Sequence, residues 1–392
     1  MRIFVLLPRI PFPLEKGDKL RAFHQIKELS KNHEIILCAL NPLRNADKQS
    51  AFQQLQPYCR SINFIDLPAF GRAANILKAF FTGLPLQSGY FYSRRAAGKI
   101  VKLINEYQPD HLYAQLLRTA RYLMAFPHKK TLDYQDAFSY GLKRRADIAN
   151  PLMKFVFRME YKRMASFERI MFDRFDNKTI ISARDRDLIP HTQRRSIVVV
   201  RNGVDLDFFH PFSRKKTQEI VFTGNMGYPP NVDAALFLAK EIMPLVWRER
   251  PEARLLLAGA EPHAKVKRLA NKRITVSGWM DDIREAYAGS MVFIAPMRIG
   301  TGLQNKLLES MAMKTPCVTT PLANASIQAK DKKEIFIGNS AVTLANALLF
   351  LLKNTQKRRQ LAENAFAFVK KNHHWSAATA PLEKLISENN IQ

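Results

Sequence analysis

The sequence predicts an α/β protein made of two Rossmann-like domains, each with a parallel sheet, that face a central cleft. The chain has 392 residues, which exceeds one ordinary core and favours two domains of roughly 150–200 residues. Continuous apolar runs such as residues 2–7 are typical of parallel strands covered on both faces. Glycine-containing loops that lead into helices follow these runs, and the pattern restarts near residue 220.

The composition is that of a basic globular protein. Hydrophobic residues make up 47% of the chain, and the formal net charge is +27. Nucleic acid, an anionic membrane surface or phosphorylated substrates would each explain such a charge. The basic residues are spread along the whole chain, without a zinc finger, an RNA-binding aromatic signature or a basic tail, so nucleic acid is the least favoured partner.

The cysteines predict a reducing compartment and no metal site. Cys38, Cys59 and Cys317 are widely spaced in apolar surroundings, which is typical of reduced core thiols. No apolar stretch approaches the ~20 residues of a membrane span, and residues 1–7 have the character of a first strand instead of a signal peptide. We therefore expect a cytoplasmic protein, with peripheral attachment to the inner face of the plasma membrane as a further hypothesis.

The first strand and helix form a possible ligand-binding turn. Prolines after the strand at residues 2–7 exclude helix until after Pro13. Gly17 precedes a helix expected from Asp18 to Lys31, where Asp18 can cap the N-terminus and Gly17 allows a ligand to approach. A strand at residues 34–40 completes the Rossmann-like unit. A purely structural turn is the alternative.

Residues 69–95 do not follow the alternation of strands and helices. Phe80 and Phe81 lie close to Lys78, and the aromatic and basic mixture returns from Tyr90 to Arg95. Such a segment suits an anionic bilayer, with Phe80, Phe81 and Phe91 inserted and Arg94–Arg95 at the headgroups. A core helix with solvated charges explains the same residues.

The rest of the first half contains two candidate substrate contacts. A helix is expected at residues 98–107, strands at 111–115 and 131–133, a long helix at 152–175, and strands at 178–182 and 196–201. Ligands bind at the carboxyl ends of strands in open α/β sheets, which makes Asp133 and Asp136 candidates. Helix capping is the alternative for both.

The second half repeats the alternation of strands, glycine loops and helices that the first half predicts. Strands are expected at residues 220–223, 254–258, 274–277 and 291–295, and a glycine loop begins at Gly224. Asp281 and Asp282 are interpreted as helix-capping residues and not as metal ligands. We place an N-terminal acceptor-binding domain at residues 1–213, a C-terminal donor-binding domain at 214–375, and a last helix, 376–392, that returns to the first domain.

Residues 296–316 contain the strongest functional signal. A loop with Arg298, Gly300 and Gly302 follows a strand and precedes a helix from about Leu303. This arrangement directs free backbone N–H groups and the positive helix end toward an anion. Lys306 adds charge, and Glu309 on the same helix face can accept two ribose hydroxyl hydrogen bonds. The pattern predicts a nucleotide diphosphate site, although Lys306 and Glu309 are also spaced as a surface ion pair.

Together these segments resemble the glycosyltransferase family 4 enzymes of GT-B architecture over essentially the whole chain. Within that family the chain is most similar to the sugar transferases of exopolysaccharide and PEP-CTERM systems, through residues 16–21 and the 298–306 segment. The remaining motifs that carry the resemblance are residues 11–17, 202–205, 222–225, 278–282, 308–312 and 315–316.

The resemblance implies a retaining transfer of a sugar from a nucleoside diphosphate donor to a glycan or lipid-linked acceptor, with no metal cofactor. Arg298 and Lys306 would face the donor phosphates and act in catalysis, and Glu309 would bind the ribose. Asp136 falls where many relatives have a catalytic-loop histidine. The remaining implied donor-binding residues are Gly17, Gly224, Asn225, Gly302, Leu303, Gln304 and Asn305.

The chain departs from the family pattern at three places. Thr301 stands where a first glutamate is usual, Gln304 replaces a glycine, and the 224–229 loop lacks the usual Arg and Lys. A non-catalytic GT-B protein that binds nucleotide or acts as a scaffold is therefore an alternative, as is a nucleotide-sugar epimerase of the same architecture.

Overall fold

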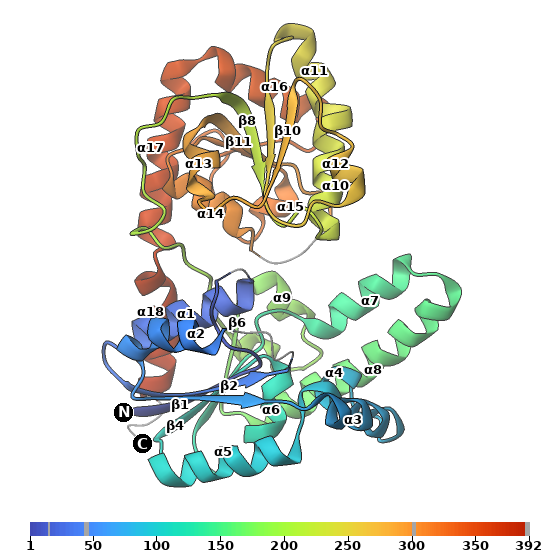
Figure 1. Ribbon diagram of the computed structural model, residues 1–392, viewed down its shortest axis with the longest axis vertical. Helices are drawn as coiled ribbons and strands as arrows, with labels where there is room; N and C mark the ends of the chain where they lie inside the picture. The colour runs from blue at the N-terminus through green and yellow to red at the C-terminus, as the bar shows by residue number, and fades with distance from the viewer. Residues whose placement is uncertain (15, 43–46, 300–302, 389–392) are drawn as a thin grey trace. The chain divides into compact units, whose positions relative to one another are not determined.

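The computed structural model describes residues 1–14, 16–42, 47–299 and 303–388. The contacts divide the chain into an N-terminal unit, residues 1–201 with 378–392, and a C-terminal unit, residues 202–377. The boundary therefore lies earlier in the chain than the expected 213/214, because residues 202–213 contact the second unit. Each unit is an α/β structure with one parallel sheet (Figure 1).

The described part of the N-terminal unit has a seven-stranded parallel sheet in the order β3-β2-β1-β4-β5-β6-β7. Its strands are β1 (Arg2–Leu7), β2 (Glu34–Asn41), β3 (Ser61–Asp66), β4 (His111–Gln115), β5 (Lys130–Asp133), β6 (Asn177–Ile180) and β7 (Val198–Val199). Its helices are α1 (Gly17–Leu29), α2 (Lys48–Leu55), α3 (Ala69–Phe81), α4 (Leu86–Phe91), α5 (Arg94–Tyr107), α6 (Leu117–Leu123), α7 (Phe138–Ile148), α8 (Pro151–Arg174) and α9 (Ala183–Leu188).

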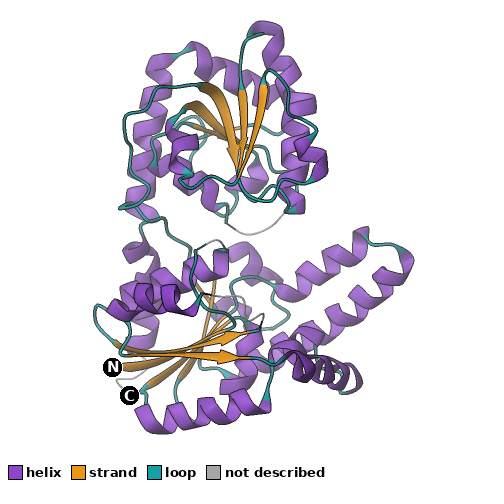
Figure 2. Ribbon diagram, in the orientation of Figure 1, coloured by secondary structure: helices purple, strands orange, loops and turns teal. Residues whose placement is uncertain are grey.

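The first strand shows why the apolar runs are continuous. Ile3 and Val5 pack into a cluster with α1 and α2, whereas Phe4 and Leu6 pack on the opposite face with α5, α6 and α8. Alternate side chains of one strand thus enter two separate cores, and helices cover the sheet on both faces (Figure 2). Leu382 and Ile386 of the last helix, α18 (Trp375–Glu388), belong to the α1–α2 core.

The described part of the C-terminal unit has a six-stranded parallel sheet in the order β10-β9-β8-β11-β12-β13. Its strands are β8 (Gln218–Thr223), β9 (Leu255–Ala258), β10 (Ile274–Gly278), β11 (Ser290–Ala295), β12 (Cys317–Thr319) and β13 (Phe336–Ile337). Its helices are α10 (Pro229–Phe237), α11 (Met243–Glu249), α12 (Ala264–Lys267), α13 (Arg284–Ala288), α14 (Asn305–Ala312), α15 (Pro321–Asn324), α16 (Ala341–Lys353) and α17 (Thr355–Asn372).

The predicted α/β fold with two parallel sheets is confirmed, and two local expectations were wrong. Asp18 does not cap α1: Lys16 occupies the cap position without a side-chain hydrogen bond, and the Asp18 carboxylate pairs with Arg9 at 2.9 Å. The membrane candidate Phe91 is buried, with 6% of its surface exposed. Among the described residues no helix is long and apolar enough to cross a membrane.

Candidate functional site

The candidate site of the C-terminal unit lies where its sheet changes direction. β8 is the first strand of this sheet along the chain and lies between β9 and β11. The strand order therefore runs outward in opposite directions from the β8–β11 pair. In open parallel sheets, ligands bind at such a switch point beyond the carboxyl ends of the strands. The loop that begins at Gly224 follows β8, and the 296–304 loop between β11 and α14 starts at the same edge of the sheet.

Lys306 extends from the first turn of α14 toward the loop after β8. Its Nζ donates a hydrogen bond of 2.6 Å to Asn231 Oδ1 and lies 5.0 Å from the centre of the Phe222 ring. Among the described residues no carboxylate forms an ion pair with this ammonium group. Burial lowers the pKa of Lys306 to about 8, and Glu309 opposes the shift. A poorly solvated, unpaired cation is well suited to bind an anion.

Gly224 is required where the β8 loop approaches Lys306. Its φ of +146° is unfavourable for residues with a side chain, and a Cβ there would lie 2.8 Å from Asn231 Nδ2 and 3.3 Å from Lys306 Nζ. Glycine therefore keeps space open next to the ammonium group.

Asn225 organises the same loop from within. Its Oδ1 accepts hydrogen bonds from the backbone N–H groups of Gly227 and Tyr228, and its Nδ2 donates to Glu261. Its backbone carbonyl accepts a hydrogen bond from the Asn231 amide at 2.9 Å. The Asn225 side chain thus holds the loop that positions Asn231, the partner of Lys306.

The N-terminus of α14 has no side-chain cap. Gln304 occupies the cap position without a capping hydrogen bond, and Leu303 packs against the core. The Asn305 Oδ1 atom is buried and has no hydrogen-bond partner among the described residues, which marks a polar group that a ligand can satisfy. The predicted site residue Gly302, with Gly300 and Thr301, lies outside the described residues.

Glu309 follows Lys306 by one turn of α14 and is held by a hydroxyl pair. The Tyr287 hydroxyl donates to Glu309 Oε2 at 2.7 Å, and it is 2.8 Å from Thr223 Oγ1 at the end of β8. Burial raises the pKa of Glu309, while the bond from Tyr287 and the charge of Lys306 act in the opposite direction. Only Oε2 is engaged by a described side chain, which leaves Oε1 to accept a hydrogen bond.

Arg298 is placed differently from Lys306. Its guanidinium pairs with Asp233 of α10 at 2.8 Å and with Glu241 at 3.4 Å, and it stacks over the Phe237 ring. Its charge is therefore already balanced by two carboxylates, so a phosphate would have to compete with them.

The other two predicted residues, Gly17 and Asp136, belong to the N-terminal unit. Gly17 opens α1, and a Cβ there would meet no described atom within 4 Å. Asp136 lies after β5 and is an exposed residue. Desolvation of its carboxyl group by neighbouring protein atoms is the main cause that raises its pKa, and the Asp185 carboxylate is the second. Arg118 and Arg144 act against that rise.

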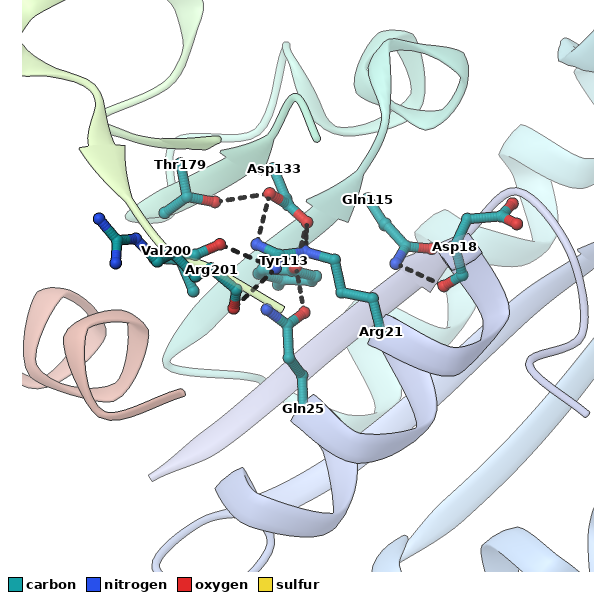
Figure 3. Close-up of polar contacts among 9 residues, drawn as sticks. All are labelled: Asp18, Arg21, Gln25, Tyr113, Gln115, Asp133, Thr179, Val200 and Arg201. Atoms are coloured by element: carbon teal, nitrogen blue, oxygen red, sulfur yellow. Dashed lines mark hydrogen bonds and ion pairs between the residues drawn. The ribbon is translucent and has the colours of Figure 1, made fainter. Parts of the chain in front are cut away.

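Asp133 is a structural residue and not a substrate contact. Its Oδ2 accepts from Arg21 Nε at 2.7 Å and from the Tyr113 hydroxyl, and its Oδ1 accepts from Arg21 Nη2 and Thr179 (Figure 3). Arg21 and Asp133 are both fully buried. Every strong acceptor position of Asp133 is occupied by the protein, so the substrate interpretation was wrong.

Sequence reasoning missed the residues that position the charged groups. Asn231 on α10, Tyr287 on α13 and Thr223 at the end of β8 come from separate elements, and only the fold brings them to α14. A Tyr among apolar neighbours does indicate a buried hydroxyl that needs a partner, but it does not identify that partner.

Comparisons with known proteins agree with this architecture. Residues 217–354, which include β8 to α16, match the family model described as glycosyl transferases group 1. The match supports a glycosyltransferase. An uncharacterised 44.6 kDa protein of the cps region of Klebsiella pneumoniae is 22% identical, with 95% of this chain and 96% of that protein covered.

Two solved structures share the fold. A sucrose-phosphate synthase from Thermosynechococcus elongatus superposes with a TM-score of 0.71 and 15% identity, and 99% of each chain is covered. The Anabaena protein HepE in complex with UDP superposes with a TM-score of 0.70 and 14% identity, covering 99% of this chain and all of the other. At these identities the likeness shows the GT-B fold.

Proposed function

We propose that the protein is a retaining glycosyltransferase that moves a sugar from a nucleoside diphosphate sugar to a glycan or lipid-linked acceptor in cell-surface polysaccharide biosynthesis. The observation that carries the proposal is the unpaired Lys306 beside the uncapped N-terminus of α14, with Glu309 one turn away. The family match over the same segment supports the reaction class, and the cps-region relative supports exopolysaccharide or lipopolysaccharide synthesis.

The donor would bind through its charged and hydroxyl groups. Lys306 and the backbone N–H groups at residues 303–306 would hold the diphosphate, since both place positive charge where a helix begins. Glu309 Oε1 would accept a hydrogen bond from the ribose, and Tyr287 fixes the carboxylate in position. The Anabaena protein of the same fold binds UDP, which supports a nucleotide donor.

The reaction needs stabilisation of a leaving group more than a protein nucleophile. The bond between the anomeric carbon and the diphosphate oxygen breaks, and the acceptor oxygen bonds to that carbon on the same face. The acceptor proton passes to the departing diphosphate, so the step is balanced without a further reactant. Preorganised cations stabilise the developing negative charge, which is the role we assign to Lys306 and the α14 N-terminus.

We propose that this chemistry uses no metal ion, because Lys306 and the helix end already supply positive charge at the diphosphate. Within the described residues no group of three or more His, Cys, Asp or Glu side chains is arranged to hold a metal. The place of action that we propose is the cytoplasm, at the inner face of the plasma membrane, on the basis of the net charge of +27.

A donor screen tests the proposal. The full chain is incubated with nucleoside diphosphate sugars of different bases, and thermal stabilisation and diphosphate release are measured. We expect one donor class to stabilise the protein and to be slowly hydrolysed, with both effects lost in Lys306→Ala. Stabilisation by nucleotide without turnover, with or without added glycan and lipid acceptors, would favour a non-catalytic binding protein. Conversion to another sugar nucleotide without an acceptor would indicate an epimerase.

A further inference from the structure

A cavity of about 190 Å³ opens in the N-terminal unit between α3, the start of α5 and α6. Three cations line it, one from each of these helices: Lys78, Arg94 and Arg121. Its other described lining residues are all neutral. A water molecule requires roughly 10–15 Å³, so the cavity admits a group much larger than water. It is therefore a cationic site with room for a ligand.

The protein supplies no counter-charge to these three cations. None of them forms an ion pair with another described residue, whereas Arg163 of the same unit pairs with Glu160. Two of the three belong to the segment from residue 67 to residue 105, which contains no Asp or Glu and six cationic residues. Like charges that line one cavity repel one another, and a bound anion would relieve that repulsion.

The guanidinium of Arg121 is held in place by a stack of aromatic rings. Its central carbon lies 3.9 Å from the centre of the Tyr92 ring, and Tyr92 stacks in turn on Tyr122 with ring centres 5.2 Å apart. The Tyr122 hydroxyl donates to the Phe91 carbonyl at 2.8 Å and accepts from the Ser93 N–H at 2.7 Å. A guanidinium stacked on a ring can still donate two parallel hydrogen bonds from its edge to an oxyanion.

Arg94 brings the positive end of a helix to the same cavity. It is the first residue of α5, a helix of 14 residues, and the Ser93 side chain accepts from the Ala96 N–H at the cap. The first backbone N–H groups of an α-helix have no partner within the helix, and the aligned peptide dipoles place partial positive charge there. Both effects favour an anion next to Arg94.

We propose that this cavity binds the phosphate group of a phosphate ester other than the nucleotide donor. A phosphate monoester has a charge of about −1.5 to −2 and three oxygens that accept hydrogen bonds, which suits three cations better than the single charge of a carboxylate does. A soluble sugar phosphate and a lipid-linked glycan both contain such a group. The site lies within the N-terminal unit and depends on neither donor binding nor sugar transfer.

Calorimetric titration of the full chain with two phosphate esters, glucose 1-phosphate and geranyl diphosphate, tests the site. Lys306→Ala serves as the parent protein, so that phosphate binding at α14 does not contribute. We expect at least one of the two esters to bind at least tenfold more tightly than glucuronate, which has a carboxylate in place of phosphate. Tighter binding of glucose 1-phosphate would assign a sugar phosphate, and tighter binding of geranyl diphosphate the diphosphate of a lipid-linked glycan. Binding of neither ester, or equal affinity for glucuronate, would overturn the proposal.

Arg94 and Arg95 provide matched variants for the same titration. Both are exposed cations at the start of α5, but only Arg94 lines the cavity. We expect Arg94→Gln and Arg121→Gln each to weaken ester binding at least threefold more than Arg95→Gln, although every variant removes one charge. Thermal unfolding verifies that the variants are folded. Equal losses in Arg94→Gln and Arg95→Gln would mean that the net charge attracts the ester without a defined site, and would overturn the proposal.

A separate measurement distinguishes this site from the proposed donor site. With Lys306 present, thermal stabilisation by the nucleoside diphosphate sugar should be the same in Arg94→Gln and in the unmodified chain. Loss of ester binding with intact donor stabilisation supports a second site. Loss of donor stabilisation in a folded Arg94→Gln protein would mean that the cavity belongs to the donor site, and would overturn the proposal of a separate ligand.

Discussion

At the scale of single residues, the two carboxylates Asp133 and Glu309 differ in how completely the protein uses them. Asp133 is fully buried and accepts four hydrogen bonds, two of them from Arg21. Glu309 is half-buried and receives one described side-chain bond, from Tyr287. A carboxylate whose oxygens all accept hydrogen bonds from the protein stabilises the fold, whereas one with an oxygen still open to a hydrogen bond can bind a ligand.

Replacing Asp133 should therefore destabilise the N-terminal unit. Asp133→Ala leaves the Arg21 guanidinium buried without its counter-charge, and breaking such a pair costs about 3–5 kcal/mol. Urea unfolding should show a lower midpoint for this variant, while Asp136→Ala, an exposed position three residues later, should change the midpoint little. Equal midpoints for Asp133→Ala and the unmodified chain would contradict the structural role.

Lys306 should make donor affinity depend on pH. Burial lowers its pKa to about 8, and a bound diphosphate would favour the charged form and raise that pKa. Affinity should hence be highest below pH 8 and fall, by up to about tenfold per pH unit, as the pH rises above 8. Calorimetric titrations across this range measure the effect. Lys306→Arg keeps its charge at these pH values and should remove the dependence, so the same pH profile in both proteins would exclude Lys306 as its source.

At the scale of elements, the candidate site depends on close packing of the turns after β8 and β9. Gly259 follows β9 with a φ of +137°, and a Cβ there would lie 2.0 Å from the Gly224 carbonyl oxygen. The loop that supports Asn231 and Lys306 can occupy its place only because both positions are glycine.

Gly259→Ala should consequently disturb the donor site as well as stability. We expect a loss of at least about 2 kcal/mol in unfolding free energy, since the clash is with backbone and the φ is unfavourable. Donor affinity should fall in parallel. Gly141→Ala is the matched control, because this α7 position has no atom within 4 Å of an added Cβ and should be neutral or slightly stabilising. Similar behaviour of the two variants in thermal unfolding would refute the packing argument.

The regular elements could be predicted from sequence because their signals are local. Apolar runs marked β1, β2 and β11 nearly to the residue, and the glycine loop before α14 was recognised as a helix start. Side-chain partners could not be predicted in this way. Asp18 binds Arg9 across the loop between β1 and α1 instead of capping α1, and no local pattern predicts that pair. Asp133 binds Arg21, which is 112 residues away and meets it only once the sheet orders the strands.

At the scale of the whole molecule, the chain repeats one sheet architecture in its two units. Each unit has a parallel sheet that changes direction at its first strand, between β1 and β4 and between β8 and β11. The C-terminal unit has the lysine without an ion-pair partner among the described residues and the carboxylate that we propose bind a nucleotide. The last helix, α18, begins in the C-terminal unit, and its residues from Ala378 onward belong to the N-terminal unit.

The central claim is that α14 binds a nucleoside diphosphate sugar, and calorimetric titration of Glu309→Ala tests it most directly. With the donor identified by the screen, we expect the dissociation constant to rise at least tenfold, or about 1.4 kcal/mol. The control is Glu363→Ala, which removes an exposed carboxylate on α17 whose one ion-pair partner among the described residues is Lys314, and which should leave affinity unchanged. Thermal unfolding verifies that both variants are folded. Unchanged donor affinity in a folded Glu309→Ala protein would remove Glu309 from the site and contradict the account.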